Sequence, residues 1–304
     1  MKRLLSIAIL LLAGLVAGQA QGDSEIQFRA TSPYHNITVV DQNGLRVLSF
    51  DGTSETRLSL ANPLQGHFEY TEYFHMAWLW NNQISNVLMI GLGGASVQRS
   101  FAHYYPDVRV ESVEIDPVVV QVAREYFGFQ ETATQRVRTE DGRVFLRRTK
   151  ATYDLIIADA YVKGRYGSSI PYHLATKEFF EMASEHLTTN GVMAYNVIGT
   201  MDGWKKDILG AMYKTMKSVF PNVYVFPATS SQNVVLIGTR DPVRINMVQV
   251  RQRTQSLVES GKVKLPDFEK RTRMLRLQTP SGTFQARVLT DDYAPIDGLL
   301  TKGR

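Results

Sequence analysis

The chain has 304 residues, of which 44% are hydrophobic and 21% are charged, and its formal net charge is +5 at pH 7. This composition argues against a disordered chain and supports a full hydrophobic core, as one domain with an appendage or as two domains. The absence of cysteine excludes disulfides, thiolate metal sites and a lipid attached through an N-terminal Cys.

The basic residues and the histidines form no motif for nucleic acid or metal. The densest basic run, residues 147–150, is typical of a solvated helix end, and the other Lys and Arg residues are dispersed. No two of the six histidines form an HxxxH or HxH pair, so a histidine metal site has little support. We therefore predict no nucleic-acid partner and no metal.

The first 20 residues have the pattern of an export signal. Lys2 and Arg3 precede a largely apolar run at residues 4–18, and the small residues Gly18 and Ala20 offer a cleavage point. The run is shorter than the ~20 residues of a typical spanning helix. We interpret residues 1–20 as the signal peptide of a periplasmic or secreted protein, with a membrane anchor at residues 4–18 as the alternative.

Residues 21–84 are expected to form a small antiparallel β domain and a linking helix. Two alternating segments flank Asn43-Gly44, a pair that favours a hairpin turn, and the strand pattern continues to about residue 65. Residues 68–82 carry aromatic and aliphatic side chains at helical spacing, which predicts a helix with a broad apolar face.

Residues 85–240 alternate between apolar strands and helices. The expected strands are 87–90, 108–115, 136–138, 153–158, 192–198, 223–226 and 234–238. The expected helices begin just after the glycines at 91–94 and then span 118–127, 142–148, 176–187 and 204–220. This alternation predicts an α/β fold with a doubly wound, mostly parallel sheet that is covered on both faces and ends in an antiparallel pair. Residues 241–304 are expected to add a helix at 242–260 and a polar tail.

Glycine or acidic residues follow four of these strands, at the edge where open parallel sheets bind ligands. They are Gly91 and Gly93, then Glu114, then Asp141 with Gly142, and finally Asp159. Glu114 lies 23 residues after Gly91, a spacing typical of an acidic residue that binds ribose hydroxyls. Each residue alone is explained as a turn, a surface charge or a helix cap, but their order on successive strands favours a nucleoside site.

The glycine loop departs from two common nucleotide-binding patterns. The third glycine of a G-x-G-x-x-G dinucleotide loop is replaced by Ser96, which disfavours pyrophosphate. A typical S-adenosylmethionine methyltransferase has an acidic residue two positions before the first glycine, where this chain has Met89. The loop therefore fits an adenosyl ligand but lacks the usual contact to an amino-acid group.

These motifs resemble those of the spermidine synthase-like aminopropyltransferases, over residues 32–238 and more loosely near the C-terminus. The matching segments are 32–37 for S-x-Y-Q-x-I, 50–52 for L-D-G, 72–76 for Y-H-E-M, 90–96 for I-G-G-G-D-G-G, 113–116 for V-E-I-D, 141–142 for D-G and 158–160 for V-D-S. The resemblance implies that the sheet is Rossmann-like, of the methyltransferase type. It also implies transfer of an aminopropyl group from decarboxylated S-adenosylmethionine to putrescine or another amine. It also implies a homodimer or tetramer, with neither a metal nor a resident cofactor.

The resemblance implies a role for each matching residue. Asp159 would be the catalytic carboxylate that takes a proton from the attacking amine, and Tyr73 would line the amine pocket. Residues 161–173 would form a loop that closes over the substrates. The residues that bind the adenosyl co-substrate would be Gly91, Gly93, Glu114 at the ribose, Asp141 and Gly142 at the adenine, and His35 in place of the family's Gln.

Two acidic positions of the family's amine site are not acidic in this chain. The Asp of the glycine loop is Gly94, and the Asp three residues after the catalytic one is Val162. As a separate departure from the motif, the Glu of Y-H-E is His75. Each lost charge-assisted hydrogen bond is worth ~1.5–3 kcal/mol, so a diamine is expected to bind more weakly. Carboxylates that could replace them from elsewhere in the sequence are Glu69, Glu72, Asp291 and Asp292.

Two other functions are compatible with the same residues. One is an S-adenosylmethionine-dependent methyltransferase. The other is an exported protein that binds an adenosyl compound or a polyamine without catalysis.

Overall fold

The computed structural model describes residues 24–164 and 167–300. The expected leader, residues 1–20, lies outside this part of the chain. Within the described residues, no helix has both the length and the apolar character needed to cross a membrane.

The N-terminal segment forms a four-stranded antiparallel sheet in the order β1-β2-β3-β4. Its strands are β1 (Ser24–Thr31), β2 (Asn36–Gln42), β3 (Leu45–Phe50) and β4 (Thr53–Ser59). Asn43 and Gly44 form the predicted turn between β2 and β3, both with positive φ angles of 50° and 73°. That combination is typical of the tight turn whose twist matches the twist of the paired strands.

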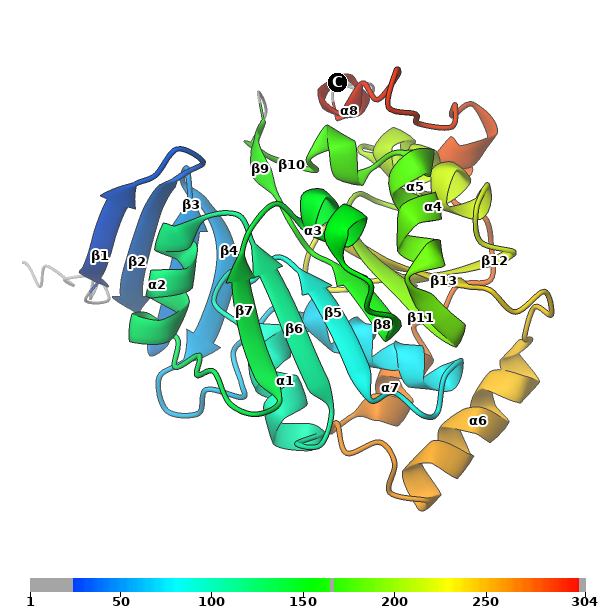
Figure 1. The fold of residues 1–304 in the computed structure, drawn as a ribbon, viewed down its shortest axis with the longest axis horizontal. Coiled ribbons are helices and arrows are strands. Elements are labelled where there is room, and N and C mark those ends of the chain that lie inside the picture. The colour runs from blue at the N-terminus through cyan, green and yellow to red at the C-terminus, as the bar shows by residue number, and fades with distance from the viewer. Residues whose placement is uncertain (1–23, 165–166, 301–304) are drawn as a thin grey trace, which may run out of the picture.

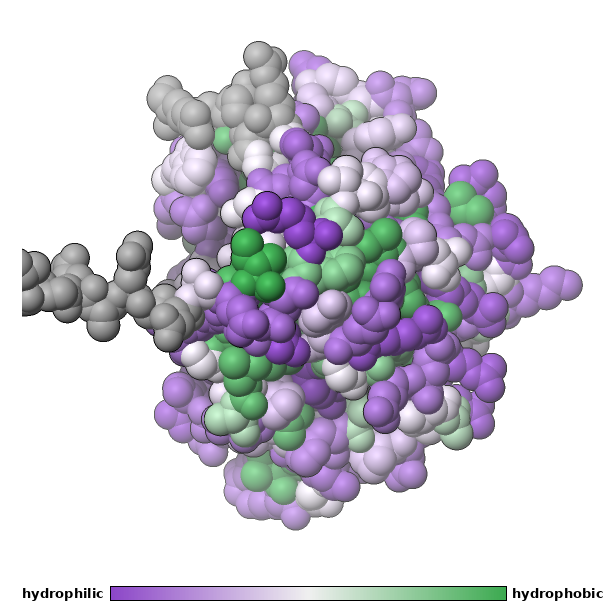
Figure 2. All heavy atoms as spheres, turned by 90° about the vertical axis from the view of Figure 1, so that its left-hand side faces the viewer, coloured by the Kyte–Doolittle hydropathy of each residue, from purple (hydrophilic) through white to green (hydrophobic). Residues whose placement is uncertain are grey.

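One face of this sheet packs against the helix α2 (Pro117–Tyr126), beside which it lies in Figure 1. Ile37, Val39 and Leu48 are buried against Val119 and Val122 of that helix. The N-terminal sheet therefore has a fixed place beside the α/β part of the fold. Figure 2 shows the side of the molecule that carries this sheet, where hydrophilic residues surround hydrophobic ones gathered near the middle.

The linking segment is a long 3-10 helix, η1 (Glu69–Leu79), and almost every one of its residues is buried. The sequence predicted a helix here with one broad apolar face. Instead the central sheet, the helix α1 (Ser96–Tyr104) and the helix α6 (Met247–Glu259) all contact η1. This enclosure also buries its polar residues, such as His75, which is 1% exposed.

The central sheet has seven strands in the order β12-β13-β11-β8-β5-β6-β7. The strands are β5 (Asn86–Ile90), β6 (Arg109–Glu114), β7 (Gln135–Thr139), β8 (Tyr153–Ala158), β11 (Leu187–Ile198), β12 (Asn222–Pro227) and β13 (Asn233–Thr239). The five from β11 to β7 are parallel, whereas β13 pairs antiparallel with both β11 and β12. The predicted mixed α/β fold with a mostly parallel sheet and an N-terminal antiparallel sheet is confirmed.

Helices cover both faces of this sheet (Figure 1). One face is buried beneath α3 (Gly142–Arg148), α4 (Lys177–Glu185) and α5 (Lys206–Lys217), and the other beneath η1, α1 and α6. The remaining elements are a β9–β10 hairpin (Val162–Gly164 and Gly167–Ser169), η2 (Tyr172–Leu174), α7 (Phe268–Thr272), η3 (Ser281–Phe284) and α8 (Ile296–Leu299).

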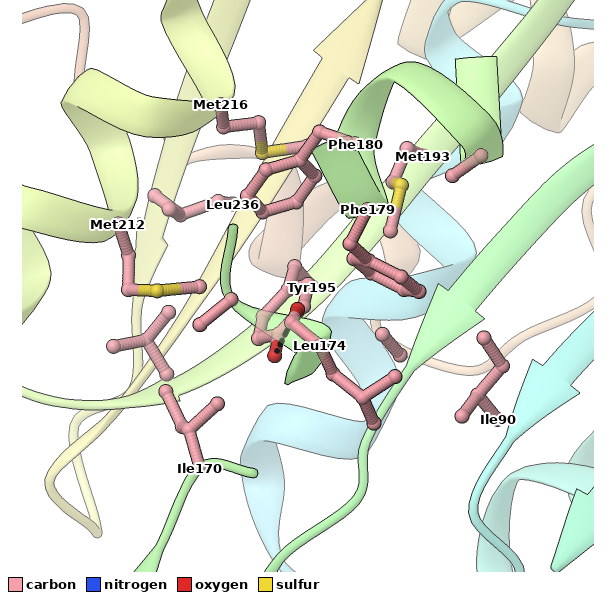
Figure 3. Close-up of a cluster of buried hydrophobic side chains, with 14 of the residues drawn as sticks. Ile90, Ile170, Leu174, Phe179, Phe180, Met193, Tyr195, Met212, Met216 and Leu236 are labelled. Atoms are coloured by element: carbon pink, nitrogen blue, oxygen red, sulfur yellow. Dashed lines mark hydrogen bonds between the residues drawn. The ribbon is translucent and has the colours of Figure 1, made fainter. Parts of the chain in front are cut away.

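Figure 3 shows the hydrophobic core between the sheet and the helices α3, α4 and α5, which holds the segment that follows β8. The hydroxyl of Tyr195 on β11 donates to the main-chain oxygen of Leu174 at 3.0 Å, while Phe179 and Phe180 of α4 pack beside it. Ile170 and Leu174 are buried in the same cluster. The chain after β8 is thus fastened to the sheet just before it turns into α4.

One boundary differs from the sequence prediction. A helix was expected at residues 176–187, but α4 ends at Glu185 and β11, which contains Asn190-Gly191, already begins at Leu187. The pairing of β11 with β8 shifts register between Leu187 and Val192. The Asn-Gly pair therefore lies within an irregular part of the strand.

Candidate active site

A cavity that is partly open to solvent lies at the carboxyl ends of the parallel strands. We call it the strand-end cavity. Seven residues predicted from the sequence line it, namely His35, Gly91, Gly93, Glu114, Asp141, Gly142 and Asp159. The structure therefore brings together the acidic residues at the carboxyl ends of β6, β7 and β8, although they lie up to 45 residues apart in the sequence.

The glycines allow two strand ends to meet beneath this cavity. Gly91 has a φ angle of +102°, and a Cβ at this position would lie 2.2 Å from the main-chain oxygen of Asp159. Gly93 also has a positive φ, of +52°. Both positions favour glycine, and at Gly91 the close approach of the β8 end leaves no room for a side chain.

The carboxylate of Glu114 is fixed by backbone donors. Leu92 N–H donates to Oε2 at 2.9 Å, and Asp116 N–H donates to Oε1 at 3.0 Å. Burial raises the pKa of Glu114, while these hydrogen bonds act in the opposite direction. Carboxylate oxygens have further lone pairs, so Glu114 retains the capacity to accept hydrogen bonds from ligand hydroxyls.

Asp141 is both a helix cap and a lining residue of the cavity. Its Oδ1 accepts from Val144 N–H at 2.9 Å at the start of α3, and its Oδ2 lies 2.9 Å from Nε2 of His173. Burial acts to raise the pKa of Asp141, but the hydrogen bonds from His173 and Val144 outweigh it and lower that pKa. His173 also lines the cavity.

Asp159 has two side-chain donors. Asn196 Nδ2 donates to Oδ1 at 2.8 Å, and the hydroxyl of Tyr70 donates to Oδ2 at 3.2 Å. Burial raises the pKa of Asp159 to about 6, although both hydrogen bonds act to lower it. The Asp159 carboxylate is therefore mostly ionised at neutral pH. Its pKa is closer to the operating pH than that of an exposed Asp, which suits a general base.

Tyr73, which the resemblance placed at the amine pocket, does not line the strand-end cavity, whereas Tyr70 does. Tyr73 is fully buried, its hydroxyl donates to Glu69 at 2.6 Å, and its ring stacks on Phe226. The family motif Y-H-E also fits three residues earlier, at Tyr70-Thr71-Glu72. In that register the tyrosine is the one that donates to Asp159, and the Glu of the motif is kept.

The two non-acidic positions have different surroundings. Val162, on β9, lines the cavity. Gly94 lies beneath β4, where its N–H donates to Thr56 Oγ1 at 3.0 Å. A Cβ at position 94 would lie 2.5 Å from Thr56 Cγ2 and 2.8 Å from Phe127 Cδ1. The N-terminal sheet thus fills the space that a side chain on this loop position would need.

The replacement carboxylates suggested by the sequence are occupied elsewhere. Glu69 and Glu72 both pair with Arg271, and Asp291 accepts two hydrogen bonds from Arg143 at 2.6–2.7 Å. None of these residues, nor Asp292, is among those that line the strand-end cavity in the part of the chain the structure describes.

Sequence analysis missed Glu55, a residue of β4 that lines the strand-end cavity. Ser168 on β10 donates to Glu55 Oε1. Burial, together with the nearby charges of Asp159 and Asp51, raises the pKa of Glu55 to about 7, although the Ser168 hydrogen bond acts to lower it. The period-two pattern of β4 could have placed Glu55 on one face of its strand. No local signal shows that this face meets the strand-end cavity.

The segment expected to close over the site, residues 161–173, contains the β9–β10 hairpin and lies beside the N-terminal sheet (Figure 1). Tyr161, Val162, Pro171 and His173 line the cavity. Lys163 pairs with Asp51 of the β3–β4 turn at 3.0 Å, which adds a second contact between hairpin and sheet. The cavity is thus enclosed between the strand ends, the N-terminal sheet and this segment.

The lining of the cavity is strongly acidic. Its described residues include four carboxylates, those of Glu55, Glu114, Asp141 and Asp159, and include no Lys or Arg. Among the described residues, no group of three or more His, Asp or Glu side chains is arranged to hold a metal ion. The charge of the lining favours a ligand that carries positive charge, because a cation would offset the repulsion among these carboxylates.

The fold is shared by solved structures of a spermidine synthase and of a methyltransferase. A probable spermidine synthase from Corynebacterium glutamicum has a TM-score of 0.65 at 22% identity, covering 86% of this chain and 95% of that one. Human methyltransferase-like protein 13 in complex with SAH has a TM-score of 0.57, also at 22% identity, covering 65% and 94%.

Sequence comparison identifies the family. The profile of the spermine/spermidine synthase domain matches residues 67–234. A polyamine aminopropyltransferase from Vibrio vulnificus is 31% identical over 298 residues, which is 94% of this chain and 95% of the relative. The chain belongs to the spermine/spermidine synthase family, a family of transferases.

Proposed function

We propose that this protein transfers an aminopropyl group from decarboxylated S-adenosylmethionine to putrescine or another amine. The observation that carries the proposal is the strand-end cavity with four carboxylates and, among its described residues, no Lys or Arg. The decarboxylated donor has a sulfonium and a primary ammonium but no carboxylate, so its charge is complementary to this lining. Family membership supports the same reaction class.

The proposed chemistry needs one base and close positioning. Asp159 accepts a proton from the ammonium of the acceptor, and the resulting free amine attacks the propyl carbon bonded to sulfur. The new C–N bond forms as the C–S bond breaks. The electron pair of the C–S bond stays on sulfur, so the leaving group is neutral methylthioadenosine. Tyr70 and Asn196 orient the Asp159 carboxylate. General-base catalysis of this kind contributes roughly 10²–10⁴-fold to a rate.

The remaining predicted residues bind the adenosyl part. In this proposal Glu114 accepts from ribose hydroxyls, Asp141 accepts from the adenine amino group, and Gly142 lets the base approach. A Cβ at Gly142 would lie 2.4 Å from Ile90 Cγ2. His35 stacks on Phe50 at 4.3 Å between ring centroids and lines the same cavity. No step requires a metal.

A methyltransferase is the second candidate, because methyltransferases share this fold. Its donor, S-adenosylmethionine, carries a carboxylate that would face the acidic lining without an ionic partner among the described cavity residues. The two functions give different products. Aminopropyl transfer leaves methylthioadenosine, whereas methyl transfer leaves S-adenosylhomocysteine.

The test is to incubate the purified protein with each donor and a panel of mono-, di- and polyamines, and to identify products by mass spectrometry. With the decarboxylated donor we expect methylthioadenosine and an acceptor heavier by one aminopropyl group. With S-adenosylmethionine we expect neither product. A methylated acceptor, or binding of the donor with no product from any amine, would contradict the proposal.

We also propose that residues 1–20 direct export, with residues 4–18 as a retained anchor in the alternative, and that the protein forms a homodimer or tetramer. The charged start and apolar run of the leader support export. Fractionation of cells expressing the full chain with a C-terminal tag, followed by N-terminal sequencing, tests it. A cytoplasmic protein that keeps Met1 would contradict export, and sedimentation would measure the oligomer.

A further inference from the structure

We infer that Glu55 binds the primary ammonium of the transferred aminopropyl group, so that the N-terminal sheet supplies the anionic contact that the glycine loop lacks. This inference rests on the proposed function and names a residue outside the family motifs quoted above. It also makes the site selective for a donor with an ammonium but no carboxylate at the end of its side chain.

The first argument is that the other three carboxylates in the strand-end cavity already accept more hydrogen bonds than Glu55 does. Glu114 accepts from two backbone N–H groups, and Asp141 caps α3 and contacts His173. Both lie toward the nucleoside end of the proposed ligand. Asp159 is held by Tyr70 and Asn196 as the proposed base. Within the described residues Glu55 has a single hydrogen-bonding side chain, Ser168, so it retains the most acceptor capacity for a ligand.

The second argument is the packing of β4 on the glycine loop. Thr56 accepts from Gly94 N–H at 3.0 Å, and its methyl group occupies the place where a side chain at position 94 would begin. Glu55 is the adjacent residue and lines the same cavity. The strand that prevents an Asp on the loop therefore carries a carboxylate into that cavity.

The third argument is electrostatic. Glu55 and Asp159 lie close enough for the charge of Asp159 to raise the pKa of Glu55, and no Lys or Arg of the described residues lines the cavity between them. Two carboxylates without a cation destabilise each other's ionised form. A ligand ammonium placed between them relieves that repulsion, whereas a ligand carboxylate increases it.

The experiment compares two ligands by titration calorimetry at about pH 8, where carboxylates with these shifted pKa values are ionised. Decarboxylated S-adenosylmethionine carries the ammonium, and methylthioadenosine has the same nucleoside without it. For Glu55→Gln we expect the affinity for the donor to fall about 10- to 100-fold, the usual size for a lost charge-assisted contact. We expect methylthioadenosine to bind the variant as it binds the wild type, within about twofold.

Two further variants define the effect. Glu25→Gln removes a carboxylate from exposed β1 of the same sheet and should change neither affinity. Glu55→Asp keeps the charge on a shorter side chain and should retain part of the donor affinity, even if Glu55→Gln folds poorly.

The outcomes separate the role of Glu55 from the proposed transferase function. Equal losses for both ligands, or no loss of donor affinity, would overturn the role of Glu55 while leaving the transferase reaction intact. A wild-type protein that binds methylthioadenosine but neither binds nor uses the decarboxylated donor would overturn the proposed function itself.

Discussion

The main-chain oxygen of Asp159 lies so close to Gly91 that a Cβ on residue 91 would be 2.2 Å away from it. Asp159 N–H in turn donates to Ile90 O at 2.9 Å. These contacts join the ends of β5 and β8, so the glycine loop and the proposed base hold a fixed relative position. Positioning of this kind is a main source of rate in a displacement between two bound substrates.

Gly91→Ala should therefore damage both stability and ligand binding. The added Cβ meets backbone atoms that cannot rotate away, at a φ that L side chains rarely adopt, so we expect the free energy of unfolding to fall by about 2–4 kcal/mol. Gly128→Ala is the matched control, because Gly128 also has a positive φ, of +67°, but has nothing within 4 Å of its Cβ position. Its expected loss is about 1 kcal/mol. Urea denaturation measures both, and equal losses would argue against the contact with Asp159.

The parts of the site that sequence analysis predicted well depend on short-range signals. An apolar strand followed by glycine or an acidic residue marks a strand end, and parallel pairing places such ends at one edge of the sheet. Gly91, Glu114, Asp141 and Asp159 therefore fall together without knowledge of any distant contact.

The parts that it missed depend on contacts between distant segments. The hydrogen bond from Gly94 to Thr56 joins residues 38 positions apart in the sequence. Without this contact, nothing indicates that Glu55 reaches the strand-end cavity. Tyr70 and Tyr73 lie three residues apart and fit the same short motif, so the choice between them needs the direction of each side chain. Packing of η1 on the sheet settles that direction, and no periodicity in the sequence encodes it.

Asp159→Asn should remove catalysis and retain nucleoside binding. Without a base, we expect the rate of transfer to fall by about 10²–10⁴-fold, while methylthioadenosine binds as before. In the wild type, kcat/KM should fall as pH decreases through about 6, because protonated Asp159 cannot accept a proton. A variant that keeps more than about a tenth of the wild-type rate would contradict the assignment of the base.

The same variant should be more stable than the wild type near neutral pH. The pKa of Asp159 is raised from 3.8 to about 6, so the folded state binds this proton more tightly than the unfolded state does. Its contribution to stability is then greatest below pH 3.8 and is lost as pH rises through about 6. We expect Asp159→Asn to gain about 1–2 kcal/mol at neutral pH and to lose that advantage in acid. Urea denaturation of both proteins across this range measures the difference, and a less stable variant at neutral pH would contradict the role of burial.

Tyr70→Phe and Tyr73→Phe form a matched pair that tests which tyrosine serves the site. Tyr70 donates to Asp159, so its loss should raise the pKa of Asp159 further and move the acid limb of kcat/KM toward neutral pH. Tyr73 donates to Glu69 outside the cavity, so its loss should lower stability by about 1 kcal/mol and leave the pH profile in place. A shift of the profile in Tyr73→Phe alone would restore the register first predicted from the sequence.

Gly94→Asp, which returns the family's acidic residue to the glycine loop, should not strengthen donor binding. Its Cβ would lie 2.5 Å from Thr56 Cγ2 and 2.8 Å from Phe127 Cδ1, so we expect a loss of about 1–3 kcal/mol of stability from overpacking. Thr56→Ser removes the nearer methyl group and keeps the oxygen that accepts from Gly94 N–H. The double variant should therefore recover part of the stability that Gly94→Asp loses, and a double-mutant cycle by thermal denaturation measures this coupling. If Gly94→Asp alone is stable and binds the decarboxylated donor more tightly than the wild type, then β4 does not fill this position as the packing indicates, and the loop rather than Glu55 is the natural place for the contact to the ammonium.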